Sequence, residues 1–168
     1  IGKRNINNMA ILLAIDEYDD IDFTESKYSG RDGDIFRKYM QNLFGMDDYQ
    51  LYPSKLWQME QGPLKNDFSK VFDPHQGIIR NRVIASSKYS NIDFVDISIF
   101  YSGLGSWFNN KPHLIPKDGK KIDPSSFVNL EGILMNLSKL SVLQNINSIT
   151  IYLDIKYINY SDARQDYQ

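Results

Sequence analysis

Apolar residues along this chain gather in short runs separated by amphipathic or polar segments. Three runs have the length and apolar character of buried strands: residues 9–15, residues 94–100, and the run from Ile149 to Ile155. Between them, apolar residues recur at helical spacing. This alternation of strands and helices predicts an α/β domain with a mainly parallel central sheet.

Helical periodicity predicts three helices. The first covers about residues 34–44, with Asp32 as its N-cap and Gly45 as its C-terminal stop. The second surrounds Ile79, and the third begins at Asp123, which precedes a proline suited to the first helical turn. The apolar stripe of the first helix contains Ile35, Phe36, Tyr39, Met40, Leu43 and Phe44. The third helix is expected to present Phe127, Leu130, Leu134 and Leu137 on one face.

The remaining segments are shorter or irregular. Residues 50–52 and 113–116 are expected to be brief extended pieces. Residues 54–73 lack clear periodicity and contain a Gly-Pro pair, which predicts an irregular excursion.

The strand at residues 94–100 leads directly into Tyr101-Ser-Gly-Leu-Gly105. A strand followed by a tight glycine turn is where an α/β enzyme commonly presents a catalytic side chain. The side chain presented here is Leu104, which can neither accept nor donate a proton.

Composition excludes several classes of function. The chain has 168 residues, of which 42% are hydrophobic and 24% charged, as expected for one globular domain. A net charge of -2 provides no basic field for nucleic acid. The absence of cysteine excludes disulfides, thiolate metal sites and thiol nucleophiles. No apolar run is long enough to span a membrane. Because the chain begins at Ile1 without an initiator methionine, we expect a fragment or a processed piece.

Several segments together resemble the caspase and metacaspase-like peptidases (the C14 group). Residues 12–18 resemble the family's first strand and loop, and residues 32–45 resemble its first helix. Tyr101-Ser-Gly-Leu-Gly105 resembles the turn that delivers the catalytic histidine, and residues 114–118 resemble the extended piece after it. Ile151-Tyr-Leu-Asp154 resembles the strand that leads to the nucleophilic cysteine.

The resemblance extends over about residues 9–160 and implies a fold. That fold is a three-layer caspase-like sandwich with a mainly parallel central sheet. Residues 1–168 would form a single caspase-like domain that corresponds to the large-subunit part of the family, and the small-subunit part is absent from this chain.

Carried over by position, the family's catalytic histidine falls on Leu104 and its cysteine on Lys156. A cysteine peptidase needs a thiolate and a neighbouring imidazole, and leucine supplies neither function. Lysine is a nucleophile only when its pKa is depressed. The resemblance therefore predicts a pseudo-peptidase with vestigial dyad positions at Leu104 and Lys156, no catalytic residues, no metal and no cofactor.

A domain without peptidase activity is expected to act through its surface, as a protein-binding, regulatory or assembly module. Without the small-subunit strands, the strand from Ile149 to Ile155 would present an open apolar edge. An active caspase-like chain or another subunit is expected to complete the sheet there. A leucine at position 104 is also expected to make the old substrate cleft more apolar. Possible contact residues are Tyr101, Trp107, Phe108 and Asp154.

Two alternatives remain open. An α/β enzyme with different chemistry would use Lys156, a bound metal, or the acidic cluster after the first strand. That cluster consists of Asp16, Glu17, Asp19 and Asp20. A purely structural component of a larger complex would use residues 54–73 for docking. His113, Ser102 and Ser106 are interpreted as structural residues of loops and turns.

Overall fold

The computed structural model describes residues 7–53, 62–89, 94–143 and 145–158, with residues 87–89 described by their backbone alone. The strands are β1 (Met9–Ala14), β2 (Leu51–Tyr52), β3 (Val95–Phe108), β4 (Lys111–Leu114), β5 (Val128–Asn129) and β6 (Ile146–Ile158). The helices are α1 (Ser29–Phe44), α2 (Lys65–Phe72), α3 (Ile78–Tyr89) and α4 (Leu130–Ser141), with 3-10 turns at Asp48–Gln50 and Pro124–Ser126.

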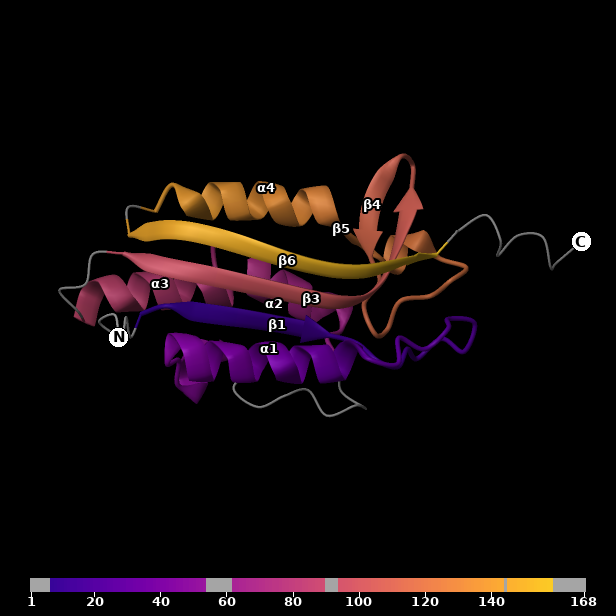
Figure 1. Ribbon diagram of the computed structural model, residues 1–168. Coiled ribbons are helices and arrows are strands. Elements are labelled where there is room, and N and C mark those ends of the chain that lie inside the picture. Colours follow the sequence, from indigo (N-terminus) through magenta and orange to yellow (C-terminus); the bar gives the residue numbers. More distant parts are fainter. Residues whose placement is uncertain (1–6, 54–61, 90–93, 144, 159–168) are drawn as a thin grey trace, which may run out of the picture.

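The strands form one six-stranded sheet around β3. Strands β1 and β6 both pair with β3 in parallel, and β2 pairs with β1 in parallel. Strand β4 is antiparallel to β3, and β5 is antiparallel to β4. In Figure 1, β1, β3 and β6 run side by side and the β4 hairpin rises near one end of the sheet. The α/β class is confirmed, but the prediction of a mainly parallel sheet is wrong because the sheet is mixed.

The antiparallel part of the sheet comes from a hairpin that the hydrophobic pattern does not indicate. Asn109 and Asn110 join β3 to β4, and their φ angles are 51° and 57°. Two consecutive left-handed residues form the kind of tight turn whose twist matches paired strands. Asparagine adopts this conformation more readily than most residues.

Strand β3 passes straight through the Gly-Leu-Gly segment where the sequence predicts a tight turn. The two glycines serve close packing inside the strand. A Cβ on Gly103 would lie 2.8 Å from the Tyr18 hydroxyl, and one on Gly105 would lie 2.5 Å from Cγ2 of Ile155. Glycine inside a strand commonly marks such close approaches.

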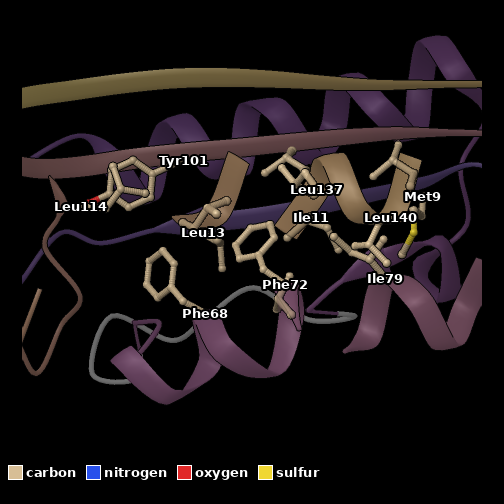
Figure 2. Packing of buried hydrophobic residues seen from close by; sticks show 14 of the residues in the cluster. Met9, Ile11, Leu13, Phe68, Phe72, Ile79, Tyr101, Leu114, Leu137 and Leu140 are labelled. Atoms are coloured by element: carbon tan, nitrogen blue, oxygen red, sulfur yellow. The ribbon is translucent and has the colours of Figure 1, made fainter. Parts of the chain in front are cut away.

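One large hydrophobic cluster fills the space between the sheet and helices α2, α3 and α4 (Figure 2). The strands contribute alternate residues, because successive side chains of a strand point to opposite faces. These include Met9, Ile11, Leu13, Ile97, Ile99 and Tyr101. The helices contribute residues such as Phe68, Phe72, Ile79, Leu137 and Leu140. Each large apolar side chain buried in this way contributes roughly 1.5–3 kcal/mol, so this cluster is the main source of stability.

The other set of alternate strand residues packs against α1. Ala10 and Leu12 contact Met40 in a smaller cluster. The ring of Phe36 stacks on that of Phe100, with 4.7 Å between the ring centroids. A Cβ on Gly33 would lie 2.9 Å from Cβ of Ala14, so this glycine permits a close approach of helix and sheet.

Most of the predicted apolar stripe of α1 faces outward. Its exposed members are Ile35, Tyr39, Leu43 and Phe44, with exposed fractions between 46% and 70%. The buried positions of the helix are Ser29, Gly33, Arg37 and Met40. Three of these four buried residues are small or polar, and the helix leaves an apolar surface uncovered by the described part of the chain.

Helix α1 begins at Ser29, and the prediction of a start capped by Asp32 is wrong. The carboxylate of Asp16 accepts a hydrogen bond of 2.6 Å from the backbone N–H of Gly30. A side chain at residue 30 would collide with that carboxylate. The helix ends as predicted at Gly45, which has a left-handed φ of 63° and donates its N–H to the carbonyl of Met40.

Helix α4 also begins elsewhere than predicted. Asp123 accepts a hydrogen bond from Ser125 N, but it caps only a 3-10 turn. The N-cap of α4 is Asn129, whose side chain accepts the N–H of Gly132 at 3.1 Å. The inward face of α4 consists of Leu130, Ile133, Leu137 and Leu140. Leu134, which was predicted on that face, is exposed.

Helix α2 lies inside the segment that was predicted to be irregular. It buries Phe68, Val71 and Phe72, and residues 54–61 of the same segment lie outside the described residues. The sequence pattern does not indicate this helix, because eight residues are too few to establish helical periodicity. Within the described part of the chain, no helix combines the length and the apolar character that crossing a bilayer requires.

The cap of α1 can be tested with Asp16→Ala, which removes the acceptor for Gly30 N–H and a negative charge at the N-terminus of the helix. We expect this change to lower the free energy of unfolding by about 1 kcal/mol. Urea denaturation followed by circular dichroism measures the difference. Glu17→Ala is the control, because Glu17 is exposed on the same loop. Equal stability of the two variants would contradict the assigned cap.

Candidate functional site

Leu104 and Lys156 lie directly opposite each other on adjacent parallel strands. They are register partners in the pairing of β3 with β6, so their side chains leave the same face of the sheet. Their surroundings differ completely. Leu104 is fully buried, and Lys156 is exposed.

Leu104 is sealed by a small apolar cluster. It packs with Phe23, Ile115 and Phe127, and all four side chains are buried. Phe23 belongs to the loop between β1 and α1, so this loop closes over the end of the sheet. The sequence predicts that Leu104 makes the old substrate cleft more apolar, and the structure buries this side chain in a cluster with the aromatic ring of Phe23.

The acidic cluster after β1 ties this loop in place. Asp19 forms an ion pair of 2.6 Å with Lys117, and Asp20 accepts a hydrogen bond of 2.8 Å from Lys121 N. Asp16 caps α1, as described above. The three carboxylates serve separate partners and do not converge on one point. No group of three or more histidine, aspartate or glutamate residues in the described part of the chain could hold a metal ion.

Two tyrosine hydroxyls support the backbone at Leu104. Tyr18 accepts a hydrogen bond of 2.6 Å from Leu104 N, and Tyr101 donates to the carbonyls of Leu104, at 2.6 Å, and Ile115, at 3.2 Å. Both hydroxyls lie close to Gly103. Burial raises the pKa of each hydroxyl well above its ordinary value. Both tyrosines are therefore neutral hydrogen-bonding residues across the physiological pH range.

A groove of about 580 Å³ lies beside Lys156. Its walls are residues 24–29, Asp32 of α1, and the side chains of Asp154 and Lys156. Asp154 accepts a hydrogen bond of 3.1 Å from the hydroxyl of Ser102. The groove is thus lined by both acidic and basic groups, at the end of the sheet where the parallel strands finish.

The predicted contact residues have different roles. Tyr101 is buried, and its hydroxyl bonds backbone carbonyls, so this side chain supports the strand instead of meeting a partner. Trp107 is 57% exposed, and its ring lies 6.1 Å from that of Tyr157. Phe108 contacts the ring of His113 edge-on. Asp154 is exposed and lines the groove.

The residues weighed as substitutes for the dyad occupy structural positions. His113 is buried in β4, with its Nδ1 atom 2.9 Å from the Lys111 carbonyl. Ser102 is bonded to Asp154, and Ser106 is fully buried. None of these three side chains lines the groove beside Lys156.

Exposed apolar side chains lie on both faces of β6. Tyr152, Leu153 and Tyr157 of β6 are between 42% and 47% exposed. The ring of Tyr152 lies 5.2 Å from that of Phe36, which connects β6 to the uncovered stripe of α1. Exposed apolar side chains gathered along one strand are typical of a surface that binds another protein.

Sequence reasoning missed Phe23 and Tyr18, which close and support the site. Both lie in a polar loop that carries no periodic pattern. The available signal was the presence of aromatic residues in such a loop, since a buried aromatic ring contributes a large apolar area to packing.

Comparisons with known proteins assign no family to this chain. No protein-family model matches it, and no curated protein matches it. The chemistry of the site therefore follows from the contacts, burial and charges given above.

The buried tyrosines predict a loss of stability in alkali. Burial raises the pKa values of Tyr18 and Tyr101 in the folded state. The unfolded state therefore releases these protons at a lower pH, near the ordinary tyrosine pKa of about 10. Their stabilising contribution is complete below that pH and declines as the pH rises beyond it. Urea denaturation between about pH 8 and about pH 11, a range that spans the tyrosine pKa of about 10, measures this decline in the free energy of unfolding.

Tyr18→Phe isolates one of the two hydroxyls. We expect it to cost roughly 1–3 kcal/mol near neutral pH, because it removes the acceptor for a buried N–H, and to flatten the alkaline decline. Tyr28→Phe is the matched control, because Tyr28 is 63% exposed. An alkaline decline of unchanged slope in Tyr18→Phe would contradict the assignment.

Proposed function

We propose that this chain is a catalytically inactive caspase-like (C14) domain that acts as a protein-binding, regulatory or assembly module. The proposed fold is the three-layer caspase-like sandwich, with residues 1–168 as its large-subunit part. The mixed character of the sheet is compatible with this reading, because the added strands β4 and β5 extend from the end of β3 and leave β1, β3 and β6 adjacent.

The pairing of Leu104 with Lys156 is the observation that carries the proposal. The resemblance assigns the family's histidine and cysteine to these two positions, which are register partners on neighbouring strands. Peptide hydrolysis by a cysteine peptidase needs a thiolate and a neighbouring imidazole. Leucine and lysine provide neither group, and the loop carrying Phe23 fills the space above Leu104.

The uncovered surface supports a binding role. Among the described residues, β6 pairs only with β3, so the backbone groups of its other edge are available. Tyr152 and Leu153 expose apolar area beside that edge. A partner that adds a strand to β6 would bury both the edge and this area. The proposed partner is an active caspase-like chain or another subunit of a complex.

The alternative of an enzyme with different chemistry gains no support from these contacts. Lys156 is exposed, whereas a nucleophilic lysine is normally desolvated so that its pKa falls. Asp16, Asp19 and Asp20 are each used to hold the loop after β1. The role of a purely structural component rested on residues 54–73, of which 54–61 lie outside the described residues.

The vestigial dyad can be tested by restoring it. Because the chain contains no cysteine, Lys156→Cys introduces a single thiol that can be followed without background. Adding Leu104→His places an imidazole on the neighbouring strand, where it should lower the pKa of the thiol. We expect the rate of alkylation by iodoacetamide at mildly acidic pH to rise about five- to tenfold over Lys156→Cys alone.

The matched control for this test is Lys156→Cys with Leu134→His, because Leu134 is exposed on α4 away from the site. Circular dichroism establishes that each variant is folded before its alkylation is measured. Identical alkylation rates in the Leu104→His and Leu134→His backgrounds would contradict the proposed dyad geometry.

The binding role predicts where a partner touches the chain. A photo-reactive benzoylphenylalanine at Tyr152 should crosslink to another polypeptide in native complexes, because Tyr152 lies on β6 beside its uncovered edge. The same group at Leu134 on α4 should not. Mass spectrometry of the adducts identifies the partner segment, which we expect to be an extended strand. Adducts at neither position, or equally at both, would count against this surface.

A further inference from the structure

One edge of strand β6 has no strand beside it among the described residues. It extends from Ile146 to Ile158, and the structure pairs it with β3 alone among the described residues. Every residue of β6 is at least partly exposed, although Ile149, Ile151 and Ile155 pack against the large cluster. Folded proteins avoid long free edges, because they template pairing with other strands. The order of side chains along β6 indicates which strand fits.

A second copy of the chain would pair with β6 about a two-fold axis. In such an antiparallel pair, a residue on the axis faces its own copy, and residues equally distant from the axis face each other. Opposed side chains leave the same face of the sheet. Each possible axis position therefore specifies a full set of cross-strand pairs.

The charges of β6 select one axis position. Asp154 and Lys156 are separated by one residue, so they lie on the same face. An axis at either residue opposes like charges, which is unfavourable. Only an axis at Ile155 places each aspartate opposite a lysine of the other copy, and it does so twice. Charges of a single sign would repel a second copy, whereas this alternating pair is self-complementary.

The same axis also matches the apolar residues. It places Leu153 opposite Tyr157 of the second copy, and Tyr152 opposite Ile158 of the second copy. Ile155 meets its own counterpart. All pairs between residues 152 and 158 are thus apolar with apolar or acidic with basic. Trp107, beside Tyr157, would extend this contact on one face.

We propose that β6 pairs antiparallel with β6 of a second copy about a two-fold axis at Ile155, which joins the two sheets into one. The proposal rests on the proposed binding role and names the partner as a second copy of this chain. The two Asp154–Lys156 pairs fix the register, and the apolar pairs on either side of them supply the buried area.

Charge reversal tests the register. Sedimentation equilibrium of the 168-residue chain, from low micromolar to submillimolar concentration, should give a dimer of twice 19.5 kDa. Asp154→Lys and Lys156→Asp should each raise the dissociation constant about tenfold or more, because each opposes like charges twice. The double exchange of both residues should restore it to within about threefold, since it recreates complementary pairs.

Lys139→Asp is the matched control for Lys156→Asp, because it lowers the net charge by the same amount at an exposed position of α4, away from the edge. Circular dichroism of each variant establishes that it is folded. A chain that stays monomeric throughout, or a dimer that the single reversals leave unchanged, would overturn the proposal. A monomeric chain whose probe at Tyr152 still captures a different protein would overturn only the second copy as partner, and the binding role would stand.

Discussion

The structure depends on β3 remaining straight through its glycine-rich segment. Strands β1, β4 and β6 all hydrogen bond to it, and the parallel pairing with β6 continues beyond Gly105. The hydroxyls of Tyr18 and Tyr101 hold the backbone at Leu104 in that extended form. A turn at this point would remove the support for the β4 hairpin and would end the ladder before it reaches Lys156.

Local patterns predicted the parts of the fold that local sequence determines. Strand β1, helix α3 and strand β6 follow their apolar runs, and Gly45 stops α1 as its conformation requires. The straight course of β3 was not predictable in this way, because a glycine pair has the same local appearance in a turn and in a crowded strand. The deciding contact joins Tyr18 to Leu104, 86 positions apart in the sequence. The prediction of the start of α1 was wrong for a similar reason, because the cap of this helix is Asp16, which lies outside the local pattern.

The assignment of Leu104 and Lys156 as a vestigial dyad stays a prediction. The resemblance to caspase-like peptidases assigns the dyad to Leu104 and Lys156, and the structure makes these two residues register partners on adjacent parallel strands. Neither the residues nor the resemblance indicated that Phe23 would cover Leu104, because a loop without periodicity gives no sign of which side chain turns inward. Two neighbouring strand positions thus differ: Leu104 lies at a sealed strand end, and Lys156 lines an accessible charged groove.

The groove and the uncovered edge of β6 share the same two residues. Asp154 and Lys156 line the groove and also form the charged part of the edge. A strand added to β6 would therefore pass beside the groove and narrow its entrance, since neighbouring strands lie about 4.8 Å apart. In the proposed dimer, edge pairing would therefore compete with occupation of the groove by a bulky ligand. In the proposed dimer, Lys156 would supply one half of a complementary charge pair, so a residue that lines the groove would also fix the register of the edge.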